Sequence, residues 1–200
     1  DLLSTRELRV IYGDTDSLFI DPGFRDDVDA EFALKEGTEI CAWINQELSQ
    51  LVENEYRLPS RLELEFEKYY ARFFLPPMRG SADRARAKGY AGLRVDDGFE
   101  RVEIVGMEAV RRDWTDLAHD LQRDLLDMMF RNVPASEIEQ TLVERVDLVR
   151  NGKKDGDLVY RKALRKSVDR YTKSSPPHVK AARLLPKPRG VISYVMTLQG

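Results

Sequence analysis

The hydrophobic pattern of the chain changes its period near residue 112, and this change restricts the folds that it can adopt. Residues 7–20 and 99–106 carry apolar side chains at about every second position, which indicates half-buried β-strands. Residues 114–129 and 138–149 carry them at every third or fourth position, which indicates amphipathic helices. We therefore predict an α+β fold in which a β-hairpin, an antiparallel sheet and packed helices precede a mainly helical part.

Further segments complete the predicted secondary structure. Residues 28–55 have a helical pattern that one glycine weakens, so one long helix and two shorter ones are both compatible with it. Residues 61–75 alternate between apolar side chains and glutamates, which predicts a half-buried strand with an acidic outer face. Ser136 and Glu139 have the spacing of a capping box at a helix start. Residues 191–195 are typical of a short final strand.

Charge is distributed unevenly along the chain. The formal net charge is −3, yet residues 151–190 hold 12 Lys and Arg against 3 Asp and Glu, or +9, and the other residues carry −12. This asymmetry indicates a polyanionic partner, although a solvated basic surface with no partner would have the same composition. The change of period near residue 112 predicts a domain boundary there, between residues 1–112 and residues 113–200.

Composition excludes several classes of protein. Hydrophobic residues make up 42% and charged residues 34% of the chain, as in ordinary globular proteins, and no apolar run approaches the roughly 18–20 residues that span a bilayer. Cys41 is the only cysteine, so an intrachain disulfide is impossible and a reducing compartment fits. The N-terminus has neither signal-peptide features nor an initiator Met, so we expect a piece of a longer protein or a processed chain.

Asp14 and Asp16 lie two residues apart at the turn of the predicted hairpin. Nucleotidyl transfer, in which a 3′-hydroxyl attacks an α-phosphate and pyrophosphate leaves, uses two Mg²⁺ ions about 4 Å apart that stabilise both reacting oxygens. Magnesium prefers carboxylate and phosphate oxygens, and a rigid hairpin tip presents carboxylates where DNA and nucleotide can reach them. An Asp-x-Asp pair alone is a weak indication, because aspartate also stabilises turns.

The six residues at 12–17, Tyr-Gly-Asp-Thr-Asp-Ser, make the indication specific. They stand between two hydrophobic strands and resemble motif C of the family B DNA polymerases. The resemblance covers nearly the whole chain in the same order and spacing, and it is strongest to the bacterial branch that acts in repair and damage tolerance. The other matching segments are the acidic palm strand at 63–68, the Lys-x-Tyr motif at 88–93, the start of the thumb at 106–114, and thumb signatures at 158–162 and 176–179.

The resemblance implies a DNA-directed DNA polymerase with Mg²⁺ as cofactor, two ions being held in the complete enzyme. It implies that Asp16 is a direct metal ligand and that Asp14 has a less direct part. The family's other essential aspartate lies in motif A, and the residues that grip the nucleotide lie in motif B. Neither motif occurs in these 200 residues. We therefore expect the isolated segment to bind Mg²⁺ weakly and not to extend primers.

Lys88 and Tyr90 are two apart on a predicted strand, so they face the same way. Every base pair offers acceptors in the minor groove, so a lysine donor there can test base-pair shape without reading sequence. The resemblance assigns this role to Lys88 and Tyr90. The family's fuller Lys-Lys-Arg-Tyr pattern is not kept, because Ala87 and Gly89 replace two of its cations. The alternative is an exposed lysine beside a core tyrosine.

The basic tract is expected to hold the backbone of duplex DNA, since Lys and Arg that neutralise phosphates confer affinity without sequence preference. A structural role is expected for His178 in a turn formed by Pro-Pro-His-Val. For Glu65 and Glu67 two interpretations stay open: an exposed strand face with ion pairs to arginines, or acids near the metals. The pool of cations for these contacts is Arg161, Lys162, Arg165, Lys166, Lys173, Lys180 and Arg183. The residues predicted to bind DNA, besides Lys88 and Tyr90, are Arg111, Arg112, Arg161, Lys162 and Lys166.

The expected partners are primer–template DNA and deoxynucleoside triphosphates, with a sliding clamp bound through regions outside these residues. No membrane partner is expected, and the predicted location is the cytoplasm, at the nucleoid. One alternative is a non-catalytic duplex-binding module derived from a polymerase palm and thumb. Another is an RNA polymerase or reverse transcriptase, but these usually carry adjacent aspartates, and the Lys-x-Tyr and thumb matches disfavour them.

Overall fold

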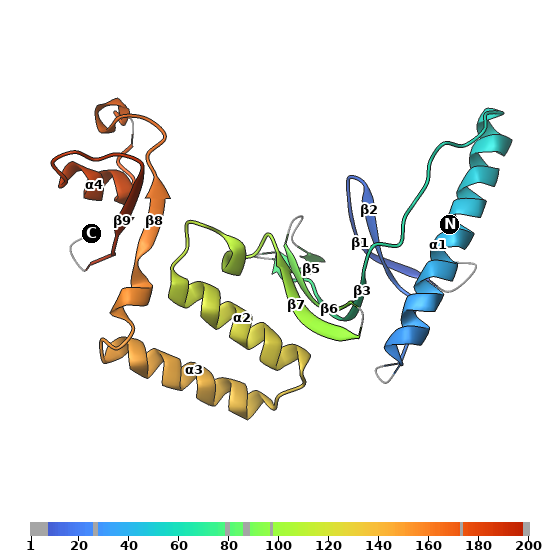
Figure 1. Cartoon of the computed structure of the whole chain (residues 1–200), viewed down its shortest axis with the longest axis horizontal. Coiled ribbons are helices and arrows are strands. Elements are labelled where there is room, and N and C mark those ends of the chain that lie inside the picture. Colours follow the sequence, from blue (N-terminus) through green and yellow to red (C-terminus); the bar gives the residue numbers. More distant parts are fainter. Residues whose placement is uncertain are drawn as a thin grey trace. The chain divides into compact units, whose positions relative to one another are not determined.

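The structure is a computed structural model that describes residues 8–25, 28–78, 81–85, 89–96, 98–172 and 174–197 (Figure 1). The chain divides into two compact units. The first unit contains residues 1–73 and 92–101, and the second contains residues 74–91 and 102–200. Helices and short strand pairs make up both, so the predicted α+β fold is confirmed. No helix in the described ranges is long and apolar enough to cross a membrane.

The first unit combines a β-hairpin, one long helix and most of a three-stranded sheet. The hairpin strands pair antiparallel, and the sheet has the order β3-β6-β7. One face of its central strand is buried, with Leu93 and Val95 on it, and on the other face Gly92 is buried between half-exposed neighbours. The elements, in chain order, are β1 (Arg9–Asp14), β2 (Ser17–Asp21), α1 (Ala30–Tyr56), β3 (Tyr69–Phe74), β6 (Tyr90–Asp96) and β7 (Phe99–Val105).

The hairpin contains a bulge that alters the predicted alternation. Val10 pairs with Ile20, whereas Tyr12 pairs with Phe19, so Ile11 is the extra residue. Directly paired residues share a face, and neighbours on one strand do not, so Val10 and Tyr12 lie on opposite faces. The sequence pattern predicts Val10 and Tyr12 on one face of the strand, and the bulge makes this prediction wrong. Tyr12 instead lies against Phe19.

Helix α1 is continuous across Gly37, so the single-helix alternative is the correct one. Asp29 caps its start by accepting a hydrogen bond from the Phe32 N–H at 3.2 Å. Gly37 is required by packing: a Cβ there would lie 2.6 Å from the ring of Phe66. The helix ends at Arg57, whose φ of 57° lies in the left-handed region.

The predicted strand at 61–75 begins only at Tyr69, so the prediction for residues 61–68 is wrong. The backbone there pairs with a side chain of α1. Asn45 accepts from the Leu64 N–H and donates to the Leu64 carbonyl, both at 2.8 Å. This carboxamide satisfies both the backbone N–H and the backbone carbonyl of Leu64, so Leu64 does not require hydrogen bonds from a neighbouring strand. The segment is extended and exposed, with Leu62 63% exposed, and is not half-buried in a sheet.

The second unit has two cores. One lies against α2, where Ala109, Leu126 and Phe130 are buried, and the other lies between α4 and β9, where Val179, Ala182 and Ile192 are buried. Helices α2 and α3 lie side by side, and β8 pairs antiparallel with β9 (Figure 1). The elements are β4 (Pro77–Met78), β5 (Ser81–Ala85), η2 (Glu108–Val110), α2 (Asp116–Phe130), α3 (Ala135–Arg150), η3 (Asp155–Leu158), β8 (Tyr160–Ala163), η4 (Val168–Arg170), α4 (Pro177–Arg183) and β9 (Val191–Tyr194).

Two local predictions in this unit are wrong because prolines set the helix starts. The Pro134 carbonyl accepts the first bonds of α3, from Glu137 and Ile138, so Ser136 lies inside the helix and forms no capping box. The expected Pro-Pro-His-Val turn is the start of α4, with Pro177 as the first helical residue. A proline fits that position because its missing N–H would have no helical partner. The final strand is confirmed.

Candidate active site and nucleic-acid interface

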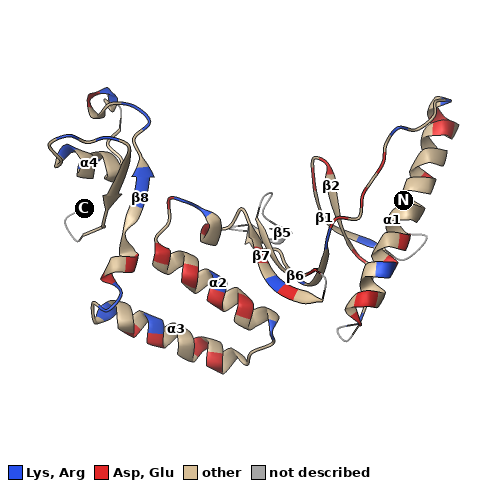
Figure 2. Ribbon diagram, in the orientation of Figure 1, with Lys and Arg blue, Asp and Glu red and all other residues tan. Residues whose placement is uncertain are grey.

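The structure places Asp14 and Asp16 at the tip of the hairpin, as predicted (Figure 2). Asp14 ends β1 opposite Ser17, and Thr15 and Asp16 form the turn. One oxygen of Asp14 accepts from the N–H and the hydroxyl of Thr15, at 2.9 and 3.2 Å. Asp16 is exposed and, among the described residues, has neither hydrogen bond nor ion pair. One carboxylate is therefore oriented by the turn, and the other is open to solvent.

Four aromatic rings support this acidic turn from within the first unit. The ring centroids of Tyr12 and Phe19 are 5.3 Å apart, and Phe19 lies 5.0 Å from Phe73 and 6.2 Å from Tyr70. Tyr70 and Phe73 on β3 are 5.5 Å apart. Such pairs add about 0.5–1.5 kcal/mol each beyond their buried area. This aromatic cluster holds the hairpin on the sheet and limits the movement of the turn.

The two aspartates suit a hard divalent cation but supply only part of a ligand set. Carboxylate oxygens are what Mg²⁺ prefers, and Asp16 has no internal partner among the described residues to compete with the metal. Within those residues, no third His, Cys, Asp or Glu joins them in a group that could hold a metal ion. Further ligands would therefore come from substrate, water or other residues of a longer chain.

Glu65 and Glu67 are exposed on the extended segment that Asn45 holds against α1. Burial and the carboxylates of Glu65 and Glu63 raise the pKa of the Cys41 thiol, so these acids lie near α1. Among the described residues, the ion pairs of the structure include neither Glu65 nor Glu67. Their predicted place near the metals stays a prediction.

Tyr90 begins β6, but Lys88 lies outside the described residues. Between them Gly89 has a φ of 138°, a backbone conformation that side-chain-bearing residues rarely adopt. Gly89 is also buried, and a Cβ there would meet Gly106 O at 3.6 Å and Met107 Cγ at 3.7 Å. The glycine that replaces a family cation is therefore fixed by the local backbone, and an arginine there would require a different conformation.

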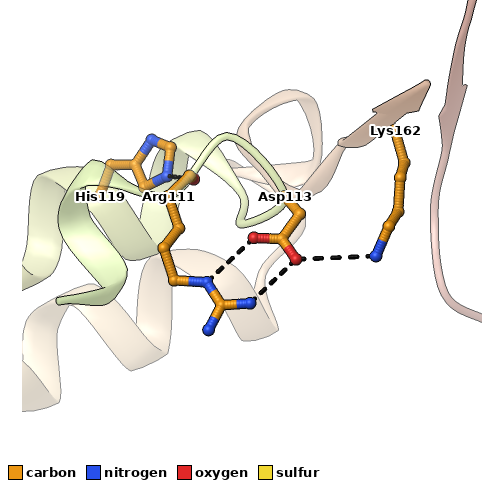
Figure 3. A network of polar contacts seen from close by, with 4 residues as sticks. All are labelled: Arg111, Asp113, His119 and Lys162. Atoms are coloured by element: carbon orange, nitrogen blue, oxygen red, sulfur yellow. Dashed lines mark hydrogen bonds and ion pairs between the residues drawn. The ribbon is translucent and has the colours of Figure 1, made fainter. Parts of the chain in front are cut away.

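Three of the predicted DNA contacts are held in ion pairs in the second unit. Arg111 makes two hydrogen bonds to Asp113, both 3.0 Å, and Lys162 Nζ lies 3.6 Å from the same carboxylate (Figure 3). The neighbouring Arg161 bonds both oxygens of Asp116, at 2.9 and 3.1 Å. The hydrogen bonds from Arg111 hold the pKa of Asp113 below its usual value, with a smaller contribution from Lys162.

The other two predicted contacts are also on the surface. Arg112 is exposed beside Arg111. Lys166 Nζ lies 4.6 Å from the centroid of the Tyr171 ring, a cation–π distance. Sequence reasoning selected the cations but missed Asp113 and Asp116. The signal available was the Arg-x-Asp spacing at 111–113, where a turn closed by the Trp114 N–H and the Arg111 carbonyl lets the two side chains meet.

His178 has the structural position that was expected, although in a helix. It is 5% exposed, its ring lies 6.1 Å from that of Tyr171, and its Nδ1 is buried with no hydrogen-bond partner among the described residues. Burial lowers its pKa, and the positive charge of Lys162 lowers it further. The imidazole is therefore neutral at pH 7.

The lowered pKa of His178 predicts acid sensitivity of α4 and β9. Below pH 6.5 the imidazole of His178 is protonated in the unfolded chain more readily than in the folded chain. The contribution of the neutral imidazole to the free energy of unfolding is therefore fully present above that pH and declines as the pH falls below it. We expect faster hydrogen exchange of the amides in 178–183 and 191–194, corrected for intrinsic rates, at pH 5.5 than at pH 7.5. His178→Leu should remove most of this difference. An equal pH dependence in that variant would contradict the assignment.

A solved structure described as the family B DNA polymerase of Pyrobaculum calidifontis matches 98% of this chain, with a TM-score of 0.54 and 26% identity, over 22% of its own chain. The sequence model described as DNA polymerase family B matches residues 3–196. The chain belongs to this family.

Among curated relatives, DNA polymerase II of Escherichia coli is 37% identical over the whole of this chain and 26% of its own length. DNA polymerase 2 of Aeropyrum pernix is 29% identical over 95% of this chain and 20% of its own length. The DNA polymerase of Thermococcus gorgonarius is 29% identical over 94% of this chain. The chain therefore spans about a fifth to a quarter of the length of these three relatives.

Proposed function

We propose that this chain is the second half of the palm and the thumb of a DNA-directed DNA polymerase. The single observation that carries the proposal is the acidic turn. Asp14 and Asp16 stand at the tip of a hairpin whose sequence resembles the family's motif C, and Asp16 is exposed without an internal partner among the described residues. Family membership over residues 3–196 supports it. The proposed palm is residues 1–112, and the proposed thumb is residues 113–200.

The substrates of the complete enzyme would be primer–template DNA and deoxynucleoside triphosphates. Asp16, with Asp14 beside it, would hold Mg²⁺ together with an acid from motif A. Two bound ions would lower the pKa of the attacking hydroxyl and neutralise charge on the leaving pyrophosphate. The hairpin, fixed by the aromatic cluster, orients the Asp16 carboxylate toward solvent where the primer end can approach. Lys88 and Tyr90 would contact the minor groove of the new base pairs, and Glu65 or Glu67 would support the acidic site.

Because motifs A and B are outside the 200 residues, the segment alone should not extend primers. Primer extension by the complete polypeptide tests the proposal. We expect each template base to select its complementary nucleotide, chelation of divalent cations to stop synthesis, and Mg²⁺ to restore it. If the complete polypeptide bound duplex DNA tightly but incorporated no nucleotide, the alternative of a non-catalytic duplex-binding module would replace this proposal.

A further inference from the structure

The cluster of Arg111, Asp113 and Lys162, here called the Asp113 site, joins two parts of the second unit. Arg111 and Asp113 lie between η2 and α2, whereas Lys162 lies on β8 (Figure 3). The carboxylate of Asp113 contacts both cations, with Arg111 on one side and Lys162 on the other. Among these three side chains, one negative charge is thus shared by two positive charges, and the carboxylate of Glu108 also acts on Arg111.

The backbone under Arg111 is fixed by side chains of α2. His119 Nε2 lies 2.6 Å from the Arg111 carbonyl oxygen, and Gln122 accepts from the Ala109 N–H at 2.6 Å. His119 and Gln122 are three residues apart and so lie on one face of the helix. On the other side, the Lys162 strand is held by its antiparallel pairing with β9. Both cations therefore project from backbone that is already ordered, which reduces the entropy cost of binding a ligand.

The site keeps donors for a second anion. Asp113 uses Nε and Nη2 of Arg111, so the edge formed by Nη1 and the second Nη2 proton has no partner among the described residues. A guanidinium edge of this kind matches two oxygens of a phosphate. Lys162 has three protons and one acidic neighbour. The side chains of Arg111 and Lys162 are 49% and 47% exposed, so a ligand can reach both.

We propose that Asp113 is a positioning residue that holds Arg111 and Lys162 together as a binding site for one phosphodiester group of duplex DNA. This proposal rests on the proposed function and adds a defined two-cation site to it. Both ion pairs are exposed to solvent, so each contributes little to stability. The gain in affinity for DNA comes from holding two flexible cations at a fixed distance from each other. Removing Asp113 should therefore weaken DNA binding, although it also removes a negative charge that would repel DNA.

The direction in which Asp113→Asn changes the Kd for DNA distinguishes a positioning role of Asp113 from simple charge repulsion. With the complete polypeptide and a primer–template but no nucleotide, we expect Asp113→Asn to raise the Kd about fivefold. The slope of log Kd against log salt concentration should fall by about one unit, as for the loss of one phosphate contact. Arg111→Gln and Lys162→Met should each weaken binding, and adding Asp113→Asn to either should have little further effect. A tighter or unchanged Kd in Asp113→Asn would overturn the proposal.

The matched control is Asp127→Asn, which removes a carboxylate of α2 that pairs with Arg131, the residue that follows the helix. This variant should leave the Kd for DNA unchanged or slightly lower.

If Asp113→Asn raised the KM for the nucleotide but left the Kd for DNA unchanged, the ligand would be a triphosphate and the proposal would be wrong. Failure of the wild-type protein to bind or extend a primer–template would instead contradict the proposed function. Melting temperatures of the variants identify any loss of DNA affinity that is caused by unfolding. Lys162→Met changes an exposed side chain and therefore tests the site independently of unfolding.

Discussion

Asp16→Asn in the complete polypeptide is expected to lower the rate of nucleotide incorporation by roughly three orders of magnitude or more, equivalent to about 4 kcal/mol of transition-state stabilisation. The amide keeps the size of the side chain but lacks the negative charge that holds a divalent cation. Asp16 is exposed in the turn and has no internal partner among the described residues, so the substitution should leave the hairpin folded. Single-turnover kinetics with saturating Mg²⁺ measure the effect.

The same hairpin provides a matched control for this substitution. Asp21 lies at the opposite end of β2, where its carboxylate pairs with Arg9 at 2.7 Å and accepts from the Gly23 N–H at 2.9 Å. Asp21→Asn changes the same chemical group on the same element, but away from the turn. We expect near wild-type incorporation from Asp21→Asn and unchanged affinity for primer–template in both variants. Undiminished incorporation by Asp16→Asn would remove the basis for the catalytic assignment of the acidic turn.

Local patterns predicted the elements that depend on local interactions. The hairpin at residues 7–20 follows from alternating apolar side chains around a turn-forming Gly-Asp-Thr-Asp stretch, and its tip lies where the sequence places it. The long helix follows from an apolar face with a period of three to four residues, although the pattern alone did not decide between one helix and two. In these elements the neighbours in sequence are also the neighbours in space.

Contacts between distant residues were not predictable in this way. The carboxamide of Asn45 pairs with the backbone of Leu64, and that pairing turns a strand-like acidic sequence into an extended segment beside a helix. The contact between Asp113 and Lys162 likewise depends on how β8 reaches the start of α2. A composition of +9 identifies a basic region, but it does not show which of its cations are already paired with an acid.

The support beneath the acidic turn predicts a second large effect, from a position that carries no functional group. Gly92 lies on the buried strand β6, and a Cβ there would lie 2.4 Å from Cδ1 of Tyr70. That contact is too short to exist, so in Gly92→Ala either the strand or the ring must move. Overpacking of this kind in a core costs about 1–3 kcal/mol. We expect a lower melting temperature of the complete polypeptide and a lower unfolding free energy of this unit.

Gly92→Ala should also lower activity, because the Tyr70 ring that it displaces contacts Phe19 and Phe73 beneath the hairpin. Tyr70→Leu removes the clashing ring, so the double variant should be more stable than the sum of the two single effects predicts, as expected for residues in direct contact. Gly156→Ala is the control, since a Cβ there meets no heavy atom within 4 Å and its φ is not positive. Equal stability of Gly92→Ala and Gly156→Ala would show that the packing of Tyr70 on β6 does not fix the position of the acidic turn.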